Sequence, residues 1–263
     1  MTLKAHISKH VLMELKYYAL RFFKGVLNVN ELNKNITSVA IGIRFNKMFT
    51  LLDSWGSIVD KVWGNSPDFL GDDYFSGISG NYITERILIN EKTGNYLKIT
   101  AADIIFRHSF EEKEFESEFS WFKKCVNELL IPEIILKYNV SKFTRIGIIF
   151  TYKFNNKDVF DSITKKIINT EMINVNDIRF SVKATVPNAL LKKGVDDYIN
   201  IIYNMSTDND NNTLLSYDYQ YYLKPKISDF RQFPHIKFIE NSISSLDTKL
   251  YSWIEGNGKN GKK

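Results

Sequence analysis

The stretches Ile36–Asn46 (ITSVAIGIRFN) and Phe143–Phe150 (FTRIGIIF) each open the same series of predicted elements. In the first, apolar residues alternate with small or polar ones, as they do in a strand that buries one face. After each stretch, the pattern predicts a helix, three further strands and a second helix. The sequence therefore predicts a duplicated half. A pseudo-symmetric molecule of this kind presents a surface or a seam more readily than one catalytic pocket.

The spacing of apolar residues gives the expected elements of each half. In the first half, the strand in Ile36–Asn46 is followed by a helix at Leu51–Trp63, strands at Tyr82–Asn90, Tyr96–Thr100 and Ile104–Ser109, and a helix at Glu114–Lys137 that Pro132 is expected to kink. In the second half, the expected elements are a strand at Ile146–Phe154, a helix at Lys157–Asn169, strands at Ile178–Thr185, Tyr198–Met205 and Leu214–Leu223, and a helix at Phe238–Ile254.

Strands joined by hairpins favour the α+β class, with an antiparallel sheet that carries helices on one face. The expected architecture is a pseudo-two-fold repeat of strand, helix, three strands and helix, preceded by an N-terminal amphipathic helix. The predicted boundaries are 1–35 for that helix and its linker, 36–140 and 141–255 for the two α+β halves, and 256–263 for a flexible basic tail. This element order is similar to the saddle of the TATA-binding protein, which has more strands per half and binds DNA through its sheet. The similarity concerns the fold alone.

Composition indicates a globular protein with a sizeable core. The chain has 263 residues, of which 44% are hydrophobic, and its net charge of +5 is mild for a dedicated nucleic-acid binder. No signal peptide is recognisable, and no apolar run reaches the ~18–20 residues that a membrane span needs. We therefore expect a cytoplasmic protein without membrane contact. The single cysteine, Cys125, lies at helical spacing among apolar residues and is predicted to belong to the core.

No complete catalytic or metal-binding motif is found, so the sequence predicts no catalytic residue, metal or cofactor. The alternative of a metal-dependent nuclease or phosphodiesterase rests on the scattered residues Asp72, Asp73, Glu85 and His108. For His108, an acid–base role with Glu111 and Glu112 competes with the favoured interpretation, a strand residue on the solvent face.

Basic and aromatic residues interleave at two places. Lys16 and Arg21 lie on the N-terminal helix, and a tyrosine-rich strand places alternate tyrosines on one face. An exposed row of tyrosines is a typical recognition surface for protein or nucleic acid. Three arginines lie on predicted strands and add positive charge. The predicted binding residues are Tyr217, Tyr219, Tyr221, Arg44, Arg107, Arg145, Lys16 and Arg21.

The stretches Val39–Asn46, Tyr96–Ile99 and Arg145–Gly147, with Trp55 and Pro67, resemble an uncharacterised bacterial family of about this length. The typical motif of the family is Arg-Ile-Gly-Leu-Arg-Tyr. This chain matches its first three residues and carries Ile149 and Phe150 in place of the last two. The resemblance spans roughly Val39 to Ile254. It implies no established activity, and the sporadic distribution of the family resembles that of mobile defence or toxin–antitoxin genes.

The leading hypothesis is a non-catalytic binding protein of a bacterial defence or regulatory system. It would recognise a partner protein, such as one encoded in the same operon, or nucleic acid, through its sheet face or its N-terminal helix. Self-association into a homo-oligomer stays open. The nuclease above is one alternative, and a stoichiometric inhibitor or immunity protein for a toxin is another.

Overall fold

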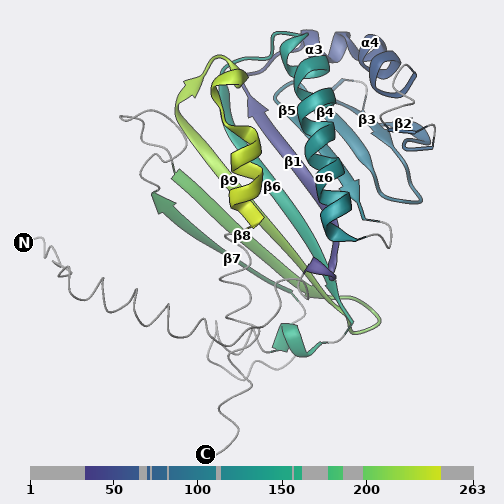
Figure 1. Cartoon of the computed structure of the whole chain (residues 1–263), viewed down its shortest axis with the longest axis vertical. Coiled ribbons are helices and arrows are strands. Elements are labelled where there is room, and N and C mark those ends of the chain that lie inside the picture. The colour runs from purple at the N-terminus through teal and green to yellow at the C-terminus, as the bar shows by residue number, and fades with distance from the viewer. Residues whose placement is uncertain are drawn as a thin grey trace, which may run out of the picture.

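The computed structural model describes residues 33–64, 70–71, 73–81, 83–110, 114–155, 157–161, 177–185 and 198–243. Nine strands of these residues form one antiparallel sheet in the order β2-β3-β4-β5-β1-β6-β9-β8-β7 (Figure 1). The strands are β1 (Ile36–Phe45), β2 (Gly77–Ser79), β3 (Glu85–Ile89), β4 (Tyr96–Thr100), β5 (Asp103–Ser109), β6 (Phe143–Phe154), β7 (Asp177–Thr185), β8 (Tyr198–Thr207) and β9 (Thr213–Ile227).

Strands β1 and β6 form the centre of the sheet and join its two halves. Their antiparallel pairing sets Gly42 opposite Gly147 and Arg44 opposite Arg145. Outward from β1 come β5, β4 and β3, and outward from β6 come β9, β8 and β7, so the two series correspond in position. The predicted pseudo-two-fold α+β arrangement is confirmed. The first half adds one short strand, β2, at its edge.

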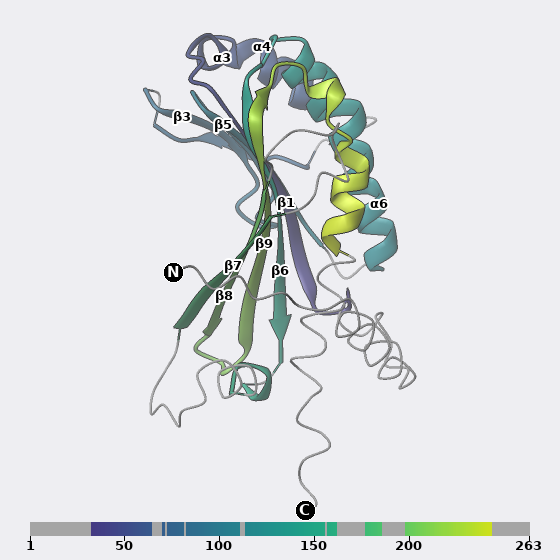
Figure 2. The ribbon, with the colours of Figure 1, turned by 90° about the vertical axis from the view of Figure 1, so that its left-hand side faces the viewer.

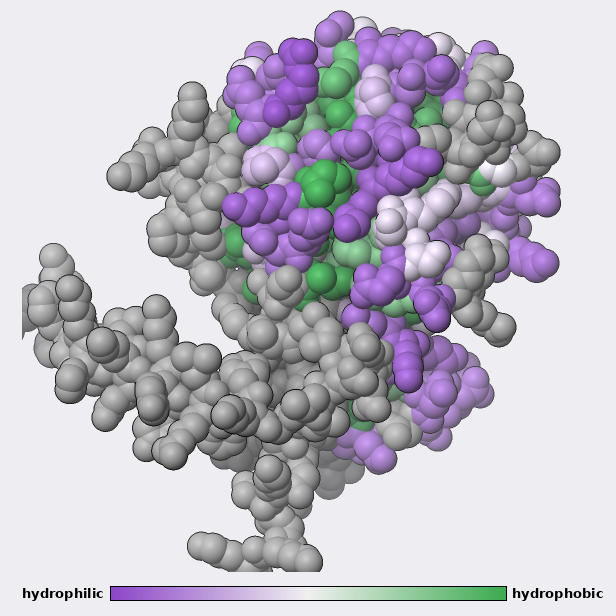
Figure 3. All heavy atoms as spheres, in the orientation of Figure 1, coloured by the Kyte–Doolittle hydropathy of each residue, from purple (hydrophilic) through white to green (hydrophobic). Residues whose placement is uncertain are grey.

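Helices pack on one face of the sheet, as the side view shows (Figure 2). They are α3 (Thr50–Asp53), α4 (Trp55–Val59), η1 (Asp60–Gly64), α6 (Phe115–Cys125), η2 (Val126–Leu136), η3 (Phe230–Gln232) and a helical segment at residues 235–243. Both α6 and the segment 235–243 run across this face. Figure 3 shows the same side of the molecule, with hydrophilic residues over much of it and apolar residues gathered in patches between them.

The core lies between the helices and the sheet. Phe119 and Phe122 recur at helical spacing on α6 and are buried. The ring of Phe122 stacks on Phe106 of β5 at 5.8 Å, and Phe119 contacts Phe150 of β6 at 5.9 Å, so one helix packs against strands of both halves. Full burial of one such ring contributes about 1.5–3 kcal/mol. Cys125 is 1% exposed and belongs to this core, as predicted.

The long helix after β5 passes from α6 into the wide turns of η2, which begin at Val126 and contain Pro132. The amide of Lys137 donates to the Pro132 carbonyl at 3.2 Å, and the amide of Val140 donates to the Ile135 carbonyl at 2.9 Å. The kink expected at Pro132 stays a prediction. These bonds span five residues where an α-helix spans four. Proline has no amide to donate and its ring collides with the preceding turn, and a wider turn relieves both problems.

One predicted helix turns out differently, and another is not tested. The one expected at Leu51–Trp63 is divided near Ser54 into α3, α4 and η1. The N-terminal helix lies outside the described residues, as does the basic tail. Among the helices that the structure describes, none has the length and apolar character needed to span a bilayer.

Candidate binding face of the sheet

The tyrosine row of β9 lies inside the protein, so the prediction that it forms an exposed recognition surface is wrong. Tyr217, Tyr219 and Tyr221 are 0%, 5% and 0% exposed. They face the helices, where Tyr219 and Tyr221 contact Phe238 with ring centroids 5.5 and 6.1 Å apart. Polar residues alternate with these tyrosines along the strand. Because burying polar groups under a helix costs more than burying phenol rings, the polar side of β9 takes the open face.

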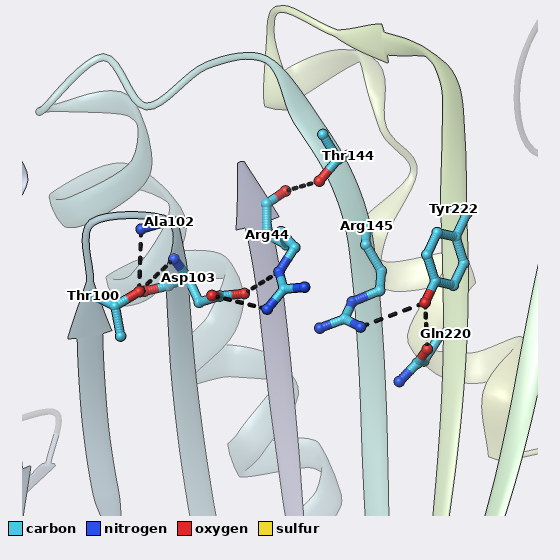
Figure 4. Close-up of polar contacts among 8 residues, drawn as sticks. All are labelled: Arg44, Thr100, Ala102, Asp103, Thr144, Arg145, Gln220 and Tyr222. Atoms are coloured by element: carbon cyan, nitrogen blue, oxygen red, sulfur yellow. Dashed lines mark hydrogen bonds and ion pairs between the residues drawn. The ribbon is translucent and has the colours of Figure 1, made fainter. Parts of the chain in front are cut away.

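Arg44, Arg107 and Arg145 lie together on the sheet face away from α6 and the segment 235–243. Each alternates with residues that point into the core. Arg44 follows Gly42 by two residues and Arg145 precedes Gly147 by two, and antiparallel pairing brings these positions directly opposite each other. Figure 4 shows the two guanidinium groups side by side. We call the surface around them the arginine face, formed by Tyr96, Lys98, Arg107, Gly42, Arg44, Arg145, Gly147, Asp218, Gln220, Tyr222 and Tyr198.

The two central arginines have different partners. Arg44 forms a two-bond ion pair with Asp103 of β5, with Nε–Oδ1 and Nη2–Oδ2 distances of 2.7 and 3.2 Å. The hydrogen bond and charge of Asp103 raise the pKa of Arg44. Arg145 lies over the ring of Tyr222, 5.8 Å from its centroid, and its Nη1 donates to the tyrosine hydroxyl at 3.5 Å. The charge of Arg44 is therefore largely neutralised within the face, whereas Arg145 contacts the neutral ring of Tyr222.

A chain of hydrogen bonds extends from Tyr222 along the open side of β9. The Tyr222 hydroxyl donates to Gln220 Oε1 at 2.9 Å, and Gln220 Nε2 donates to Asp218 Oδ2 at 2.5 Å. The Tyr222 ring also stacks on Tyr198 of β8, with centroids 4.5 Å apart and planes 8° from parallel. These contacts fix the orientation of Tyr222 beside Arg145 before any ligand binds.

Two paired glycines, which we call the glycine strip, lie at the centre of the arginine face. Gly42 and Gly147 are paired there, and a Cβ added at Gly42 would meet no atom within 4 Å. A Cβ at Gly147 would lie 3.4 Å from Asp218 Oδ1. Glycine in a strand interior weakens the strand, and it often marks a site where a ligand approaches the backbone closely.

A second arginine–tyrosine pair lies on the first half of the sheet. Arg107 of β5 is opposite Tyr96 of β4, and its guanidinium lies 5.9 Å from the ring centroid. Lys98, next on the open side of β4, forms an ion pair with Glu85 of β3. Cations and aromatic rings therefore flank the glycine strip on both sides.

Asp218 is the negative group at the centre of this surface, and burial raises the pKa of its carboxyl group above its ordinary value. Its hydrogen bond from Gln220 and the charges of Arg145 and Arg179 oppose that shift. A carboxyl group whose pKa is higher in the folded state destabilises that state when ionised. The free energy of unfolding therefore rises as pH falls from above the folded pKa toward the unfolded one.

We expect Asp218→Asn to remove this dependence. The variant should melt at a higher temperature than the wild type at pH 7, and the difference should shrink toward pH 4. Melting curves followed by circular dichroism at both pH values measure it. A variant that is less stable than the wild type at pH 7 would show that the ionised carboxylate stabilises the fold.

His108 lies on the helix-covered face, which corrects the prediction of a solvent-facing strand residue. It is 7% exposed, and its Nε2 lies 2.5 Å from Oε2 of Glu118. Glu85 is on the opposite face of the sheet with Lys98, so the structure does not bring Glu85 and His108 into one site. Among the described residues, no group of three or more His, Cys, Asp or Glu side chains is placed to hold a metal ion. Asp72, Glu111, Glu112, Lys16 and Arg21 lie outside the described residues.

Comparison with known proteins gives no family for this chain. No protein-family model and no curated protein matches it. Among solved structures, it is similar to the duplicated taurocyamine kinase from Schistosoma mansoni, with 9% identity over 88% of this chain and a TM-score of 0.33. The chain spans about a third of that kinase, 35%. It is also similar to the di-domain ARO/CYC protein StfQ of the steffimycin biosynthetic pathway, with 8% identity over 83% of this chain, 97% of that chain and a TM-score of 0.24. Scores this low do not establish a shared fold.

Proposed function

We propose that this protein is a non-catalytic binding protein whose arginine face holds single-stranded nucleic acid. The observation that carries the proposal is the adjacency of the Arg44–Arg145 pair, the stacked rings of Tyr222 and Tyr198, and the glycine strip, all on the sheet face away from α6. The proposed setting, a bacterial defence or regulatory system, follows from the family resemblance alone.

Each part of the face matches one part of a nucleotide. Guanidinium groups bind phosphate oxygens through paired N–H donors, and they also stack on aromatic planes. Base–aromatic stacking contributes about 1–3 kcal/mol per base. The ring of Tyr222 lies between the guanidinium of Arg145 and the ring of Tyr198, so a base stacks on it in the place that Arg145 leaves when its guanidinium binds phosphate. The strip at Gly42 and Gly147 lets a base or sugar approach the backbone.

Single strands fit this surface better than a duplex. Stacking on tyrosine requires an unpaired base, and in a duplex the base faces are already stacked on one another. The face also carries Asp103, Asp218 and Glu85 among its cations, so it lacks the continuous positive charge that tracks a duplex backbone. The second candidate for the ligand of the arginine face is a partner protein, whose acidic segment would contact the arginines and the tyrosine rings. The mixed charge of the face favours this candidate.

Fluorescence anisotropy with end-labelled 20-nucleotide RNA, the matching DNA strand and the matching duplex tests the proposal. We expect both single strands to bind at least about tenfold more tightly than the duplex, with an affinity that falls as salt rises. Inorganic polyphosphate is the control for charge alone. Equal affinity for polyphosphate and the single strands, or no binding of any strand at 50 mM salt, would refute the proposal and favour a protein partner.

A further inference from the structure

A cavity of about 430 Å³ lies on the helix-covered side of the sheet, away from the arginine face. Its walls come from residues 70, 71, 73 and 74, the turn between β3 and β4, the end of β5 and the first turns of α6. Tyr74, Asn95, His108, Glu118 and Trp121 supply most of its polar and aromatic lining. This volume is within the ~300–1,000 Å³ range of small-molecule sites.

A buried polar network forms the inner wall of the cavity. His108 Nε2 lies 2.5 Å from Glu118 Oε2, and its Nδ1 lies 3.3 Å from the Tyr74 hydroxyl. Burial raises the pKa of Tyr74 well above 10, so the phenol is a hydrogen-bond donor at neutral pH. The Tyr74 hydroxyl also donates to the Arg107 carbonyl at 3.5 Å, so the imidazole tautomer decides whether Nδ1 donates to the phenol oxygen or accepts from it. Trp121 lies against the imidazole, with ring centroids 4.4 Å apart.

Burying this network lowers the stability of the fold. Glu118 and His108 are 5% and 7% exposed, and their burial costs solvation that an apolar pair would not lose. Apolar neighbours occupy the equivalent inward positions further along β5, at Ile104 and Phe106. The arginine face does not use the network, because it lies across the sheet. Buried titratable groups beside a cavity are a recognised mark of a ligand site.

The charges of the lining select the ligand. Among the described lining residues, carboxylates are present at Asp73 and Glu118, and neither lysine nor arginine is present. These two carboxylates make the described part of the lining favourable to cations and unfavourable to phosphates and carboxylates. Trp121 and Tyr74 add aromatic rings, whose faces attract cations. Asn95 and Ser109 add polar groups at the same wall, where the Ser109 amide donates to Asn95 Oδ1 at 2.7 Å.

We infer that this cavity is a second binding site, which takes a small organic cation with a primary ammonium or guanidinium group. The cationic group sits toward Asp73 and Glu118, and the organic part packs on Trp121. His108 and Tyr74 are positioning residues that hold Glu118 in place through the network. The site is independent of the proposed nucleic-acid face.

Isothermal titration calorimetry with a charge series tests this inference. Tyramine, 4-hydroxyphenylacetamide and 4-hydroxyphenylacetate share one ring and differ in side-chain charge. Putrescine and agmatine extend the series in size and shape, and choline, a quaternary ammonium without N–H donors, is the negative control. We expect saturable binding of at least one cation, with the neutral amide at least tenfold weaker than tyramine and no binding of the carboxylate. Absence of saturable binding by every cation up to 10 mM, or equal binding of tyramine and 4-hydroxyphenylacetate, overturns the inference.

Variants locate the bound cation. Asp73→Asn, at an exposed residue, should weaken cation binding at least tenfold without changing the melting temperature, and Glu118→Gln should weaken it further. Glu128→Gln is the matched control, an exposed carboxylate further along the same helix.

Cation binding should change tryptophan fluorescence in the wild type but not in Trp121→Phe. Arg145→Ala should bind the cation normally, which separates this site from the nucleic-acid face. Normal cation binding by Asp73→Asn and Glu118→Gln would place the ligand elsewhere and refute the site.

Discussion

The double variant Tyr219→Ala/Tyr221→Ala is expected to lose its cooperative fold. Both rings are buried against Phe238, and Tyr221 also contacts Phe233 at 5.7 Å. Removing one large buried aromatic side chain typically costs 3–5 kcal/mol, so the pair costs roughly 6–10 kcal/mol. The whole stability of a natural domain is about 5–15 kcal/mol. Urea unfolding followed by circular dichroism should show a midpoint near zero or no transition, and insoluble expression would agree with it.

Tyr222→Ala is the matched control from the same strand. Its side chain is half-buried on the arginine face, so the variant should keep a cooperative transition and lose only about 1 kcal/mol, mainly from its stack on Tyr198. Its affinity for single strands should fall, because the stacking ring is gone. If the Tyr219/Tyr221 variant unfolded at the wild-type midpoint, the inward orientation of these rings would be wrong.

The alternation along β9 contains the information that places its tyrosines inside. Ser216, Asp218 and Gln220 occupy the positions between them, and polar residues at every second position mark the solvent side of a strand. The prediction of an exposed tyrosine row follows from the residue type, tyrosine, and disregards this alternation. The same alternation holds along β5. Ile104, Phe106 and His108 are alternate residues on one face of the strand, so the imidazole lies inside with the two apolar side chains.

The arginine pair depends on information that local patterns lack. The sequence predicts both central strands and puts Arg44 and Arg145 on them. Their adjacency follows only from the antiparallel register that sets Gly42 opposite Gly147. Periodicity fixes which face a residue takes, but the register between strands over 100 residues apart depends on packing of the whole sheet. Tyr222, the ring beside Arg145, belongs to the tyrosine-rich strand but is not among the predicted binding residues, because it breaks the odd-numbered tyrosine series.

Helix interruptions are predicted less well than strands. Pro132 signals a disturbance in the long helix, but the sequence does not distinguish a kink from a widened turn, since both relieve the missing amide. The network of Tyr74, His108 and Glu118 joins a loop, a strand and a helix. Its members lie up to 44 residues apart in the sequence, so no short sequence motif predicts that they come together.

Replacing both central arginines tests the proposed function most directly. Arg44→Ala/Arg145→Ala should bind single-stranded RNA about 30-fold more weakly than the wild type, which corresponds to about 2 kcal/mol. Each lost phosphate contact should also lower the slope of log affinity against log salt by about 0.7, so the double variant loses about 1.4. Anisotropy titrations at several salt concentrations measure both quantities, and melting temperatures confirm that the fold is kept.

The single variants should be unequal, because the two arginines have different surroundings. Arg44 already shares its charge with Asp103, so Arg44→Ala should weaken binding less than Arg145→Ala. Arg145→Lys should recover the salt slope but only part of the affinity, since lysine keeps the charge and loses the planar group that stacks on Tyr222. Arg231→Ala is the control, an exposed arginine paired with Asp229 outside the sheet, and should bind as the wild type does. An equal loss from Arg231→Ala and Arg145→Ala would mean that net charge, and not the arginine face, carries the affinity.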